Sequence, residues 1–520
     1  MTHQIAMMSI ELFLAVPMGL EDVVVRKLSS SLCQVATEIH YSLGSGYVIV
    51  VLPAIGTLAE EGKDVVFKTL SDLVDHPPLC IFSAHVSLGS IHVPRVIFKD
   101  PAELLALAKQ KFRLNNHPSM QEAQPSRESS SPLATTTSVV QVDEKETSLH
   151  WEQALAVLKL VSPPSFTDRM DESLSTENSN DKESDPVRFR ASFDRGDIQH
   201  KGVRSQDIAA ALGSLAGDRF PRWKVNLTEF DVEVIGRWIQ DVEETDRVYF
   251  KEVSASNTRK RARTDDDGEV ETARLGTTGQ SEVQPSQQME SGSKRMQVGI
   301  TLPLALSACP YRFRPKDGRT SLRMEIAYTL VGLADPKPGD IVVDTCSGVG
   351  TIPIIGAAHY PQCLFLGSEI LPPNVERANE NSREMMGRVD LARIEGCRPQ
   401  PQPQQPSPSQ NSRSHSRPSL ILGDAKAVCL RSSSVDLVIS DLPWGQRESS
   451  HLSNCKLYPK LVKEIIRMLR AGGRAVLVTG ERKLLQRQLD APFAKPYLRV
   501  VEKREITIGF KVVAFELVRL

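Results

Sequence analysis

The residues best suited to chemistry are Asp441, Leu442, Pro443 and Trp444, which closely follow an apolar run at 435–439. Two acceptors in this turn can bind the two hydrogens of an exocyclic amine: the Asp441 carboxylate and the backbone carbonyl of Leu442 or Pro443. Such a grip bends the nitrogen toward tetrahedral geometry and turns its lone pair toward a methyl donor. The Trp444 indole offers a face on which a purine can stack. The alternative is a strand that ends in an ordinary Asp-x-Pro turn.

An upstream stretch predicts a strand, a tight glycine turn and a helix. The apolar residues 341–343 end in Asp344, and a loop of small residues then leads into an apolar helical segment. Glycines let the backbone turn sharply and approach a ligand closely, and the helix N-terminus points its N–H groups at that ligand. The candidate ligand-binding residues of this loop are Asp344, Cys346, Gly348, Gly350 and Thr351. Nucleotides, flavins and S-adenosylmethionine all suit such a turn, which lacks the Gly-Lys-Ser/Thr ending of a P-loop.

Two further acids lie where a doubly wound sheet would place ligand-binding residues. Glu369 ends a second apolar strand, 25 residues after Asp344, and a carboxylate there can accept both hydroxyls of a ribose. Asp424 closes a third apolar strand and is positioned to accept from an adenine amino group. Two strand candidates around Gly509 predict a closing antiparallel hairpin on the parallel sheet. This is the plan of a class I methyltransferase and is not expected of a nicotinamide dehydrogenase.

Length and composition limit the broad class of the protein. A chain of 520 residues holds about three or four domains, and its net charge of −1 provides no overall attraction to nucleic acid. It contains no apolar run long enough to span a bilayer, and its N-terminus does not read as a signal peptide. The eight cysteines are scattered without a Cys-x-x-Cys pair, which favours reduced thiols in an intracellular protein without a metal site.

The pattern along the chain predicts an α/β protein in three folded parts. The first is an α+β unit over residues 8–115, in which 101–111 is expected to be a helix. A largely disordered linker with one short helix at 151–160 follows over 116–186. A second α+β module is expected over 187–306 with a disordered insert at 251–295, and the α/β domain over 321–520 with a disordered insert at 397–418.

Local basic groups are the candidates for nucleic-acid contact. Arginines alternate along one face of a strand in the second module, and others gather between this module and the α/β domain. The residues predicted to contact RNA are Arg188, Arg190, Lys224, Arg312, Arg314, Arg319 and Arg323. The alternatives are a solvated sheet face and a flexible hinge. A further basic run at 259–263 is either a nuclear signal or a solvated linker.

Together these motifs resemble the eukaryotic THUMP-domain guanosine N2-methyltransferases. The resemblance rests on FLAVPMGLEDVVVRKL, WKVNLTEFDVEV, VGITL, GRTSLRMEIAY, VDTCSGVGTIPI, GSEI and, most specifically, ISDLPWGQR followed by Leu457-Tyr458-Pro459. It implies a ferredoxin-like N-terminal domain, a THUMP domain that grips the tRNA acceptor end, and a Rossmann-like methyltransferase domain that uses S-adenosylmethionine. The chain departs from the family's usual pattern at Thr345, where Pro is common, and at Trp444, where Phe or Tyr is common.

The resemblance also implies roles for single residues and a partner. Asp344, Cys346, Gly348 and Gly350 match the methionine side of the cofactor loop, Glu369 the ribose acid, Asp424 the adenine-side acid, and Asp441 to Trp444 the amine-holding motif. The implied product is N2-methylguanosine near position 6 of tRNA. The implied partner is a small zinc-binding activator subunit that pairs with an edge strand at 420–423. The implied location is cytoplasmic, with a nuclear fraction if the basic run is a signal.

Three interpretations stay open on the residues alone. The first is a tRNA guanine-N2 methyltransferase. The second uses the same turn on another target: the guanosine or adenine N6 of another small RNA, or a protein glutamine. The third is an RNA-binding protein that has kept the fold without catalysis. Asp441 and the glycine loop, which a non-catalytic descendant would be free to lose, are both present.

Overall fold

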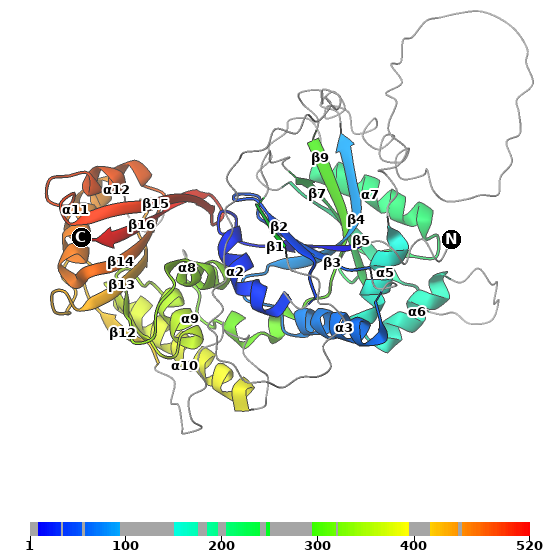
Figure 1. Cartoon of the computed structure of the whole chain (residues 1–520), viewed down its shortest axis with the longest axis horizontal. Helices are drawn as coiled ribbons and strands as arrows, with labels where there is room; N and C mark the ends of the chain where they lie inside the picture. Colours follow the sequence, from blue (N-terminus) through cyan, green and yellow to red (C-terminus); the bar gives the residue numbers. More distant parts are fainter. Residues whose placement is uncertain are drawn as a thin grey trace, which may run out of the picture.

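The computed structural model describes residues 9–32, 35–54, 58–93, 150–174, 185–195, 204–239, 246–249, 294–318, 321–394, 417–445 and 450–520. The chain forms two lobes (Figure 1). One lobe is built on a nine-stranded sheet from the N-terminal half, and the other on a seven-stranded sheet from the C-terminal half. Among the described residues, no helix combines the length and apolar character needed to cross a membrane.

The first unit has the ferredoxin-like plan that was predicted. Its elements are β1 (Ile10–Ala15), α2 (Glu21–Leu32), β2 (Glu38–Tyr41), β3 (Tyr47–Leu52), α3 (Glu60–Asp75) and β4 (Ser83–Val93). The strands lie in the order β4-β1-β3-β2, and their pairings are antiparallel. This β-α-β-β-α-β succession with that strand order is the split βαβ arrangement.

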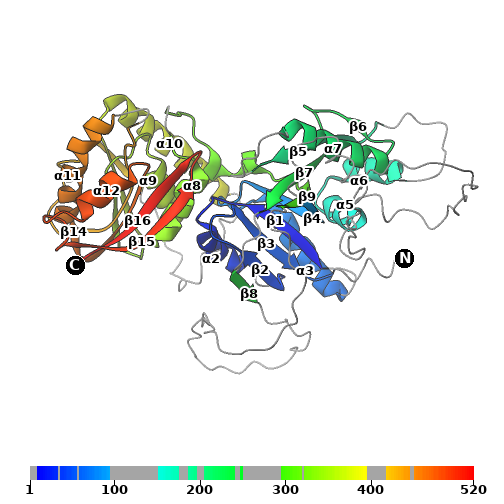
Figure 2. The ribbon, with the colours of Figure 1, turned by 90° about the horizontal axis from the view of Figure 1, so that it is seen from above.

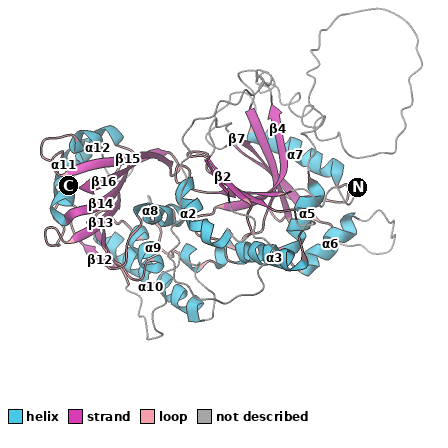
Figure 3. Cartoon of the chain, in the orientation of Figure 1, coloured by secondary structure: helices cyan, strands magenta, loops and turns pink. Residues whose placement is uncertain are grey.

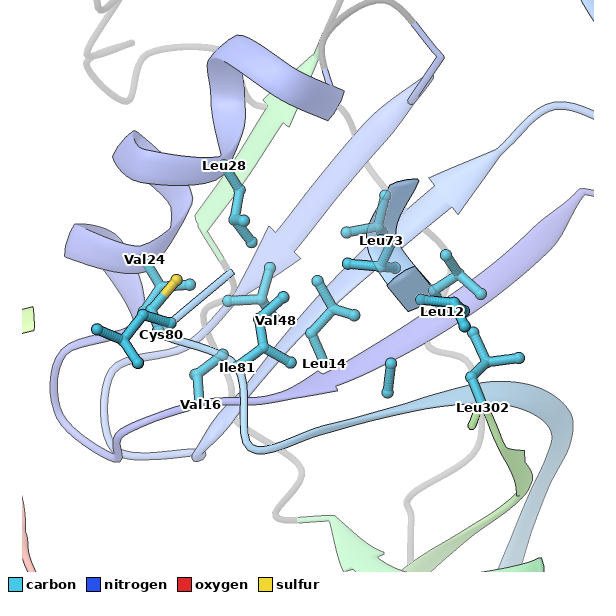
Figure 4. Close-up of a cluster of buried hydrophobic side chains, with 14 of the residues drawn as sticks. Leu12, Leu14, Val16, Val24, Leu28, Val48, Leu73, Cys80, Ile81 and Leu302 are labelled. Carbon is cyan, nitrogen blue, oxygen red and sulfur yellow. The ribbon is translucent and has the colours of Figure 1, made fainter. Parts of the chain in front are cut away.

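The core of this unit follows from the two side-chain periodicities. Leu12 and Leu14 of β1 alternate inward, whereas Val24 and Leu28 of α2 lie four residues apart on one helical face. All four are at most 1% exposed, and Figure 4 shows them converging in one cluster. Burial of each such side chain is worth about 1.5–3 kcal/mol.

The second module completes the same sheet instead of forming one of its own. Its elements are α5 (Trp151–Leu160), α6 (Pro164–Leu174), β5 (Arg188–Asp194), α7 (Ser205–Arg219), β6 (Lys224–Val225), β7 (Val232–Ile239), β8 (Asp246–Tyr249) and β9 (Lys294–Thr301). Strand β9 pairs with both β7 and β4, and β8 pairs with β2. The nine strands therefore run β6-β5-β7-β9-β4-β1-β3-β2-β8, and the sheet joins the two parts that the sequence separates.

Several expected elements differ from the structure. The linker contains a second helix, α6, because Phe166 and Met170 bury themselves four residues apart although the surrounding sequence is polar. Strand β2 is too short to give a periodic signal in the sequence and was not predicted. The expected helix at 101–111, the basic run at 259–263 and nearly all of both predicted inserts lie outside the described residues.

The C-terminal lobe has the predicted α/β fold. Its elements are α8 (Met324–Ala334), β10 (Ile341–Asp344), α9 (Thr351–His359), β11 (Leu364–Glu369), α10 (Pro372–Ile394), β12 (Ser419–Leu422), β13 (Val435–Asp441), α11 (His451–Met468), β14 (Leu469–Thr479), α12 (Arg482–Leu489), β15 (Leu498–Thr507) and β16 (Lys511–Arg519). The strand order is β12-β11-β10-β13-β14-β16-β15. All neighbours are parallel except the closing pairs made by β16, so the predicted antiparallel hairpin is confirmed. Helices flank the sheet (Figure 3).

The two lobes meet where α2 packs beside α8 and the β15–β16 hairpin, as both views show (Figures 1 and 2). Arg504, whose side chain is 9% exposed, forms an ion pair with Asp22 at the start of α2. The Thr507 N–H donates to the Met18 carbonyl at 3.1 Å. Gly19, with φ +87°, lies so close that a Cβ there would be 2.0 Å from the Glu505 carbonyl oxygen. The N-terminal unit is therefore fixed directly to the C-terminal lobe.

Candidate active site

Three predicted acids come together because each is the last residue of its strand. Asp344 ends β10, Glu369 ends β11 and Asp441 ends β13. These strands are parallel neighbours in the order β11-β10-β13, so their carboxyl ends meet at one edge of the sheet. In open α/β sheets, ligands bind at this edge. Asp344, Glu369 and Asp441 of the C-terminal lobe therefore lie at the same edge of the sheet.

The glycine loop is hydrogen-bonded to the end of β11 and has open space beside Gly348. Its two glycines have positive φ, +54° at Gly348 and +84° at Gly350. The Gly348 N–H donates to Glu369 Oε2 at 3.0 Å, which links the loop to the end of β11. A Cβ at Gly348 would meet no described atom within 4 Å, whereas one at Gly350 would press on Ile354 and Ala378. Gly348 thus faces open space, and Gly350 serves the close packing of helix α9.

Asp344 is buried at the base of this loop. Its carboxylate accepts the Cys346 N–H at 3.1 Å. Burial, and to a lesser degree the nearby Glu369 charge, raise the pKa of Asp344 to about 7, against the opposing effect of its hydrogen bonds to Cys346 and Ser440. Burial also raises the pKa of the Cys346 thiol far above its usual range, so this cysteine stays neutral and acts in packing.

The carboxylates of Glu369 and Asp424 each accept a hydrogen bond from a backbone N–H. Glu369 Oε1 accepts the Leu371 N–H at 2.9 Å, and its second oxygen accepts from the glycine loop. Asp424 accepts the Lys426 N–H at 3.0 Å and pairs with the Lys426 ammonium at 3.0 Å. Burial opposes ionisation of Asp424, but these contacts outweigh it and lower the pKa of Asp424. Each carboxylate has more lone-pair sites than these bonds use, so both keep the capacity to accept from a ligand.

The turn after β13 is shaped by its own side chains and by helix α11. The Trp444 Nε1–H donates to Asp441 Oδ1 at 3.1 Å. The Pro443 carbonyl accepts two hydrogen bonds, from Asn454 Nδ2 at 2.9 Å and from the Tyr458 hydroxyl at 2.8 Å. A carbonyl oxygen has two lone pairs, so both are used within the protein. Of the two backbone acceptors that the sequence left open, Leu442 is therefore the one that remains for an amine.

The aromatic ring of the turn has a neighbour that the sequence did not single out. Trp444 packs edge-to-face on Phe510, with ring centroids 4.9 Å apart and planes at 86°. Phe510 follows Gly509 in the turn of the closing hairpin and is 37% exposed. Asn454, Tyr458 and Thr479 were also missed as part of the site, although Tyr458-Pro459 belonged to the most specific family stretch. The other sequence signal for Asn454 and Tyr458 was the amphipathic pattern of α11, whereas Thr479 is the last residue of β14.

The residues predicted to contact RNA differ in their exposure. Arg188 and Arg190 on β5 are half-buried and form ion pairs with Glu229 and Glu233, respectively, whereas Lys224 on β6 is exposed. Arg323 is also exposed, 60%, and lies over the Phe82 ring. Arg319 lies outside the described residues.

Two of these arginines serve the fold. Arg312 is buried, bonded to Glu325 and to the Ile81 carbonyl. Arg314 donates to Thr351 Oγ1 at 2.8 Å and to the Leu322 carbonyl at 2.7 Å. Their side chains are 11% and 12% exposed, which does not favour phosphate contact.

Comparison with known proteins shows similarity to methyltransferases. Residues 312–509 match the family model described as "RMKL-like, methyltransferase domain". The chain is 26% identical over 318 residues to the Bos taurus tRNA (guanine(6)-N(2))-methyltransferase THUMP3, covering 61% of this chain and 48% of that protein. It is 28% identical over 160 residues to the Bos taurus U6 snRNA (guanine-N(2))-methyltransferase THUMPD2, covering 31% of this chain and 26% of that protein. The chain thus spans half or less of the length of these curated relatives.

The solved structures agree on the fold of the whole chain. The crystal structure of TrmN from Thermus thermophilus matches with a TM-score of 0.50 and 15% identity, covering 98% of this chain and 100% of that one. This similarity of fold extends over both lobes. The chain is therefore similar in sequence to the THUMP3 guanine-N2-methyltransferases over 318 residues, and its residues 312–509 match the RMKL-like methyltransferase domain model.

Proposed function

We propose that this protein transfers a methyl group from S-adenosylmethionine to the exocyclic N2 of a guanosine in tRNA, in the acceptor stem near position 6. The observation that carries the proposal is the Asp441 carboxylate beside a backbone acceptor at Leu442, on the strand next to the open glycine loop. Two sets of relatives are named as guanine-N2 methyltransferases, one of tRNA and one of U6 snRNA, which supports the same chemistry.

The residues of the loop fit the cofactor. The open space over Gly348 lets a ligand approach the backbone closely, and Glu369 retains acceptor capacity for ribose hydroxyls. Asp344 and Cys346 would hold the methionine side, and Asp424 would accept from the adenine amino group. When bound, S-adenosylmethionine supplies an electrophilic methyl group on a positively charged sulfur.

The turn would act on the amine by position and charge. Asp441 and the Leu442 carbonyl each accept one hydrogen of the guanine N2 group, which fixes the nitrogen and directs its lone pair at the methyl donor. Acceptors that are already oriented need little reorganisation as positive charge develops on the nitrogen. The Asp441 carboxylate is the group nearest to take up the proton that the methylated amine releases. Trp444, with Phe510 at its edge, offers the stacking surface for the base.

The experiment that tests this function is nucleoside mass spectrometry. Bulk tRNA is incubated with S-adenosylmethionine and the protein, with and without an activator subunit, and the nucleosides are then identified. We expect new N2-methylguanosine with wild type and none with Asp441→Ala, while tRNA binding measured by filter retention stays within about twofold. Unchanged turnover in Asp441→Ala would show that the turn has been misassigned.

The same assay separates the alternatives. Methylated adenosine would move the reaction to adenine N6. Product on U6 or another small RNA, with none on tRNA, would change the substrate while keeping the chemistry. RNA binding without product under any condition would favour a non-catalytic RNA-binding protein.

We also propose a heterodimer with a small zinc-binding activator subunit at strand β12. This strand is at the edge of the seven-stranded sheet, and four exposed apolar side chains lie on it and on the segments beside it. They are Ile370, Leu371, Leu391 and Leu422, each 51–59% exposed. Unpaired edges and exposed apolar groups favour addition of a strand from a partner. The chain alone should therefore be poorly soluble or inactive.

A matched pair of variants tests the partner. Leu422→Lys on β12 should abolish co-purification with the activator, whereas Val501→Lys on β15, the opposite edge, should not. Val501 has the same 59% exposure as Leu422, so the two changes differ mainly in location. Full activity of the purified chain without any partner would overturn this part of the proposal. A cytoplasmic location, with a nuclear fraction directed by the basic run at 259–263, remains a prediction.

A further inference from the structure

Behind the amine-holding turn lies a buried chain of hydrogen bonds that ends on the Pro443 carbonyl. Asn454 and Tyr458 are four residues apart on α11, so both side chains lie on the face that packs toward the turn. Both donate to this carbonyl, at 2.9 Å and 2.8 Å. The Tyr458 oxygen is also 2.7 Å from Thr479 Oγ1, at the end of β14. All three side chains are 0% exposed.

The directions of these bonds follow from the available hydrogens. A carbonyl can only accept, so the single Tyr458 hydroxyl hydrogen goes to Pro443. Thr479 must then donate to the Tyr458 oxygen, and its own oxygen accepts the Glu481 N–H at 2.9 Å. The chain therefore runs from the Glu481 backbone through Thr479 and Tyr458 to the turn. Hydrogen bonds in such a series polarise one another, and in a buried site each is costly to lose.

This arrangement has a consequence for the reacting amine. If the Pro443 carbonyl were free, it would be a second backbone acceptor one residue away from Leu442, and the amine could be held in two ways. Occupation of both its lone pairs removes that choice. It also prevents rotation of the Pro443 peptide plane, which lies between Leu442 and the Trp444 ring that bonds to Asp441.

We propose that Tyr458, together with Asn454 and Thr479, is a positioning residue for methyl transfer, because it holds the Pro443 carbonyl turned into the protein and leaves Leu442 as the one backbone acceptor for the amine. The inference rests on the proposed function and adds residues that touch neither substrate nor cofactor. Burial raises the pKa of the Tyr458 phenol above its usual range, so it keeps its hydrogen throughout the neutral pH range.

The central variant is Tyr458→Phe, which removes the hydroxyl and keeps the ring. We expect kcat to fall about 10- to 100-fold, because small misplacements of reacting groups cost that much. KM for RNA and the Kd for S-adenosylhomocysteine should change less than about threefold, since ground-state binding does not use this bond. Thr479→Val should show a smaller loss of the same kind, and Thr479→Ser, which keeps the hydroxyl, should restore activity to near wild type.

A matched control separates positioning from loss of stability. Thr329→Val in α8 also removes a fully buried hydroxyl, one that donates to the Glu325 carbonyl at 2.7 Å. It should lower the melting temperature about as much as Tyr458→Phe and leave kcat unchanged. An equal fall of kcat in both variants, or wild-type kcat in Tyr458→Phe, would overturn the proposal.

Hydrogen–deuterium exchange of the cofactor-free protein provides a readout that does not depend on activity. In Tyr458→Phe, the amides of Leu442, Trp444 and Gly445 should exchange faster, while those of β10 and β11 stay as in wild type. If wild type forms no methylated product on any RNA, the proposed function fails, and the exchange result still decides whether Tyr458 holds the turn. Unchanged exchange at 442–445 would refute the holding role even in an active enzyme.

Discussion

Arg312 forms an ion pair with Glu325 in which each side chain is only 11% exposed. Arg312 lies just after the last strand of the nine-stranded sheet, and Glu325 is in the first turn of α8. The same guanidinium donates to the Ile81 carbonyl, next to β4. A residue that was expected to contact phosphate thus joins the N-terminal unit, the connecting segment and the C-terminal lobe.

Removal of this arginine should destabilise the whole protein. Arg312→Ala leaves the Glu325 carboxylate buried with only the more distant Arg323, and loss of one partner of a buried pair costs about 3–5 kcal/mol. Thermal unfolding should show a clearly lower midpoint. Arg323→Ala is the control, because this side chain is 60% exposed and exposed pairs are worth less than about 1 kcal/mol. Equal midpoints for the two variants would contradict a structural role for Arg312.

The titration of Asp344 should make stability depend on pH. Because burial raises its pKa from 3.8 to about 7, the folded protein retains a proton that the unfolded chain has released. The stabilisation from this group is complete below about pH 4, is lost as the pH rises to about 7, and amounts to at most about 4 kcal/mol.

The measurement is the unfolding free energy from denaturant titrations of wild type and Asp344→Asn at several pH values. Asparagine has no charge to bury, and its carbonyl can still accept the Cys346 N–H. The free energy of wild type relative to Asp344→Asn should therefore fall between about pH 4 and pH 7. A difference that is constant over this window, or that rises, would show that the carboxyl is ionised in the folded protein.

The two glycines of the cofactor loop should respond differently to alanine. Gly350→Ala combines a φ of +84° with a Cβ only 3.0 Å from Ile354 Cδ1 and 3.1 Å from Ala378 Cβ, so it should destabilise by about 1–3 kcal/mol. Gly348→Ala, at φ +54° with open space around it, should lower the free energy of unfolding by about 1–2 kcal/mol. Its main effect should be that the new methyl group fills the space over the loop.

Calorimetric binding of S-adenosylhomocysteine together with thermal unfolding distinguishes these outcomes. Gly348→Ala should lose more affinity than stability, and Gly350→Ala more stability than affinity, each relative to wild type. If Gly348→Ala binds as tightly as wild type, the open space over the loop is not where the ligand lies.

Contact with RNA should depend more on Lys224 than on Arg190. Lys224 is exposed on β6, whereas Arg190 is neutralised by Glu233 at 2.8 Å and stacks on Phe230. Lys224→Ala should weaken binding of all tRNAs alike and reduce the slope of log affinity against log salt by about 1. Arg190→Ala should change this slope little. A larger effect of Arg190→Ala would mean that RNA displaces Glu233.

The α/β domain was the most predictable part of the molecule. The parallel strands β10, β11 and β13 are short runs rich in apolar residues that end in Asp344, Glu369 and Asp441, so the positions of these three acids at strand ends could be predicted from the pattern. The ferredoxin-like plan was also foreseen, although β2 was not. Its four residues, Glu38–Tyr41, alternate too briefly for a periodic signal and depend on the neighbouring strands β3 and β8.

What the sequence could not show are relationships set by tertiary contacts. No local pattern reveals that β9 lies between β7 and β4, because pairing partners far apart in the chain leave no periodicity of their own. For the same reason, the burial of Arg312 and Arg314 could not be predicted, since a basic run has the same sequence pattern on an exposed surface and at a junction between lobes. Tyr458 and Asn454 looked like core positions of an amphipathic helix, and only their distances to Pro443 assign them to the site.

The position of β9 also affects how the protein folds during its synthesis on the ribosome. Strand β4 ends at Val93, but the strand that covers its free edge, β9, begins only at Lys294. During synthesis, the free edge of β4 stays unpaired while about 200 further residues are added. Such non-local pairing is slow, and an unpaired edge favours aggregation. Any shortened gene product that stops before β9 would leave that edge unpaired. The nine-stranded sheet is therefore complete only when the chain has been synthesised through β9.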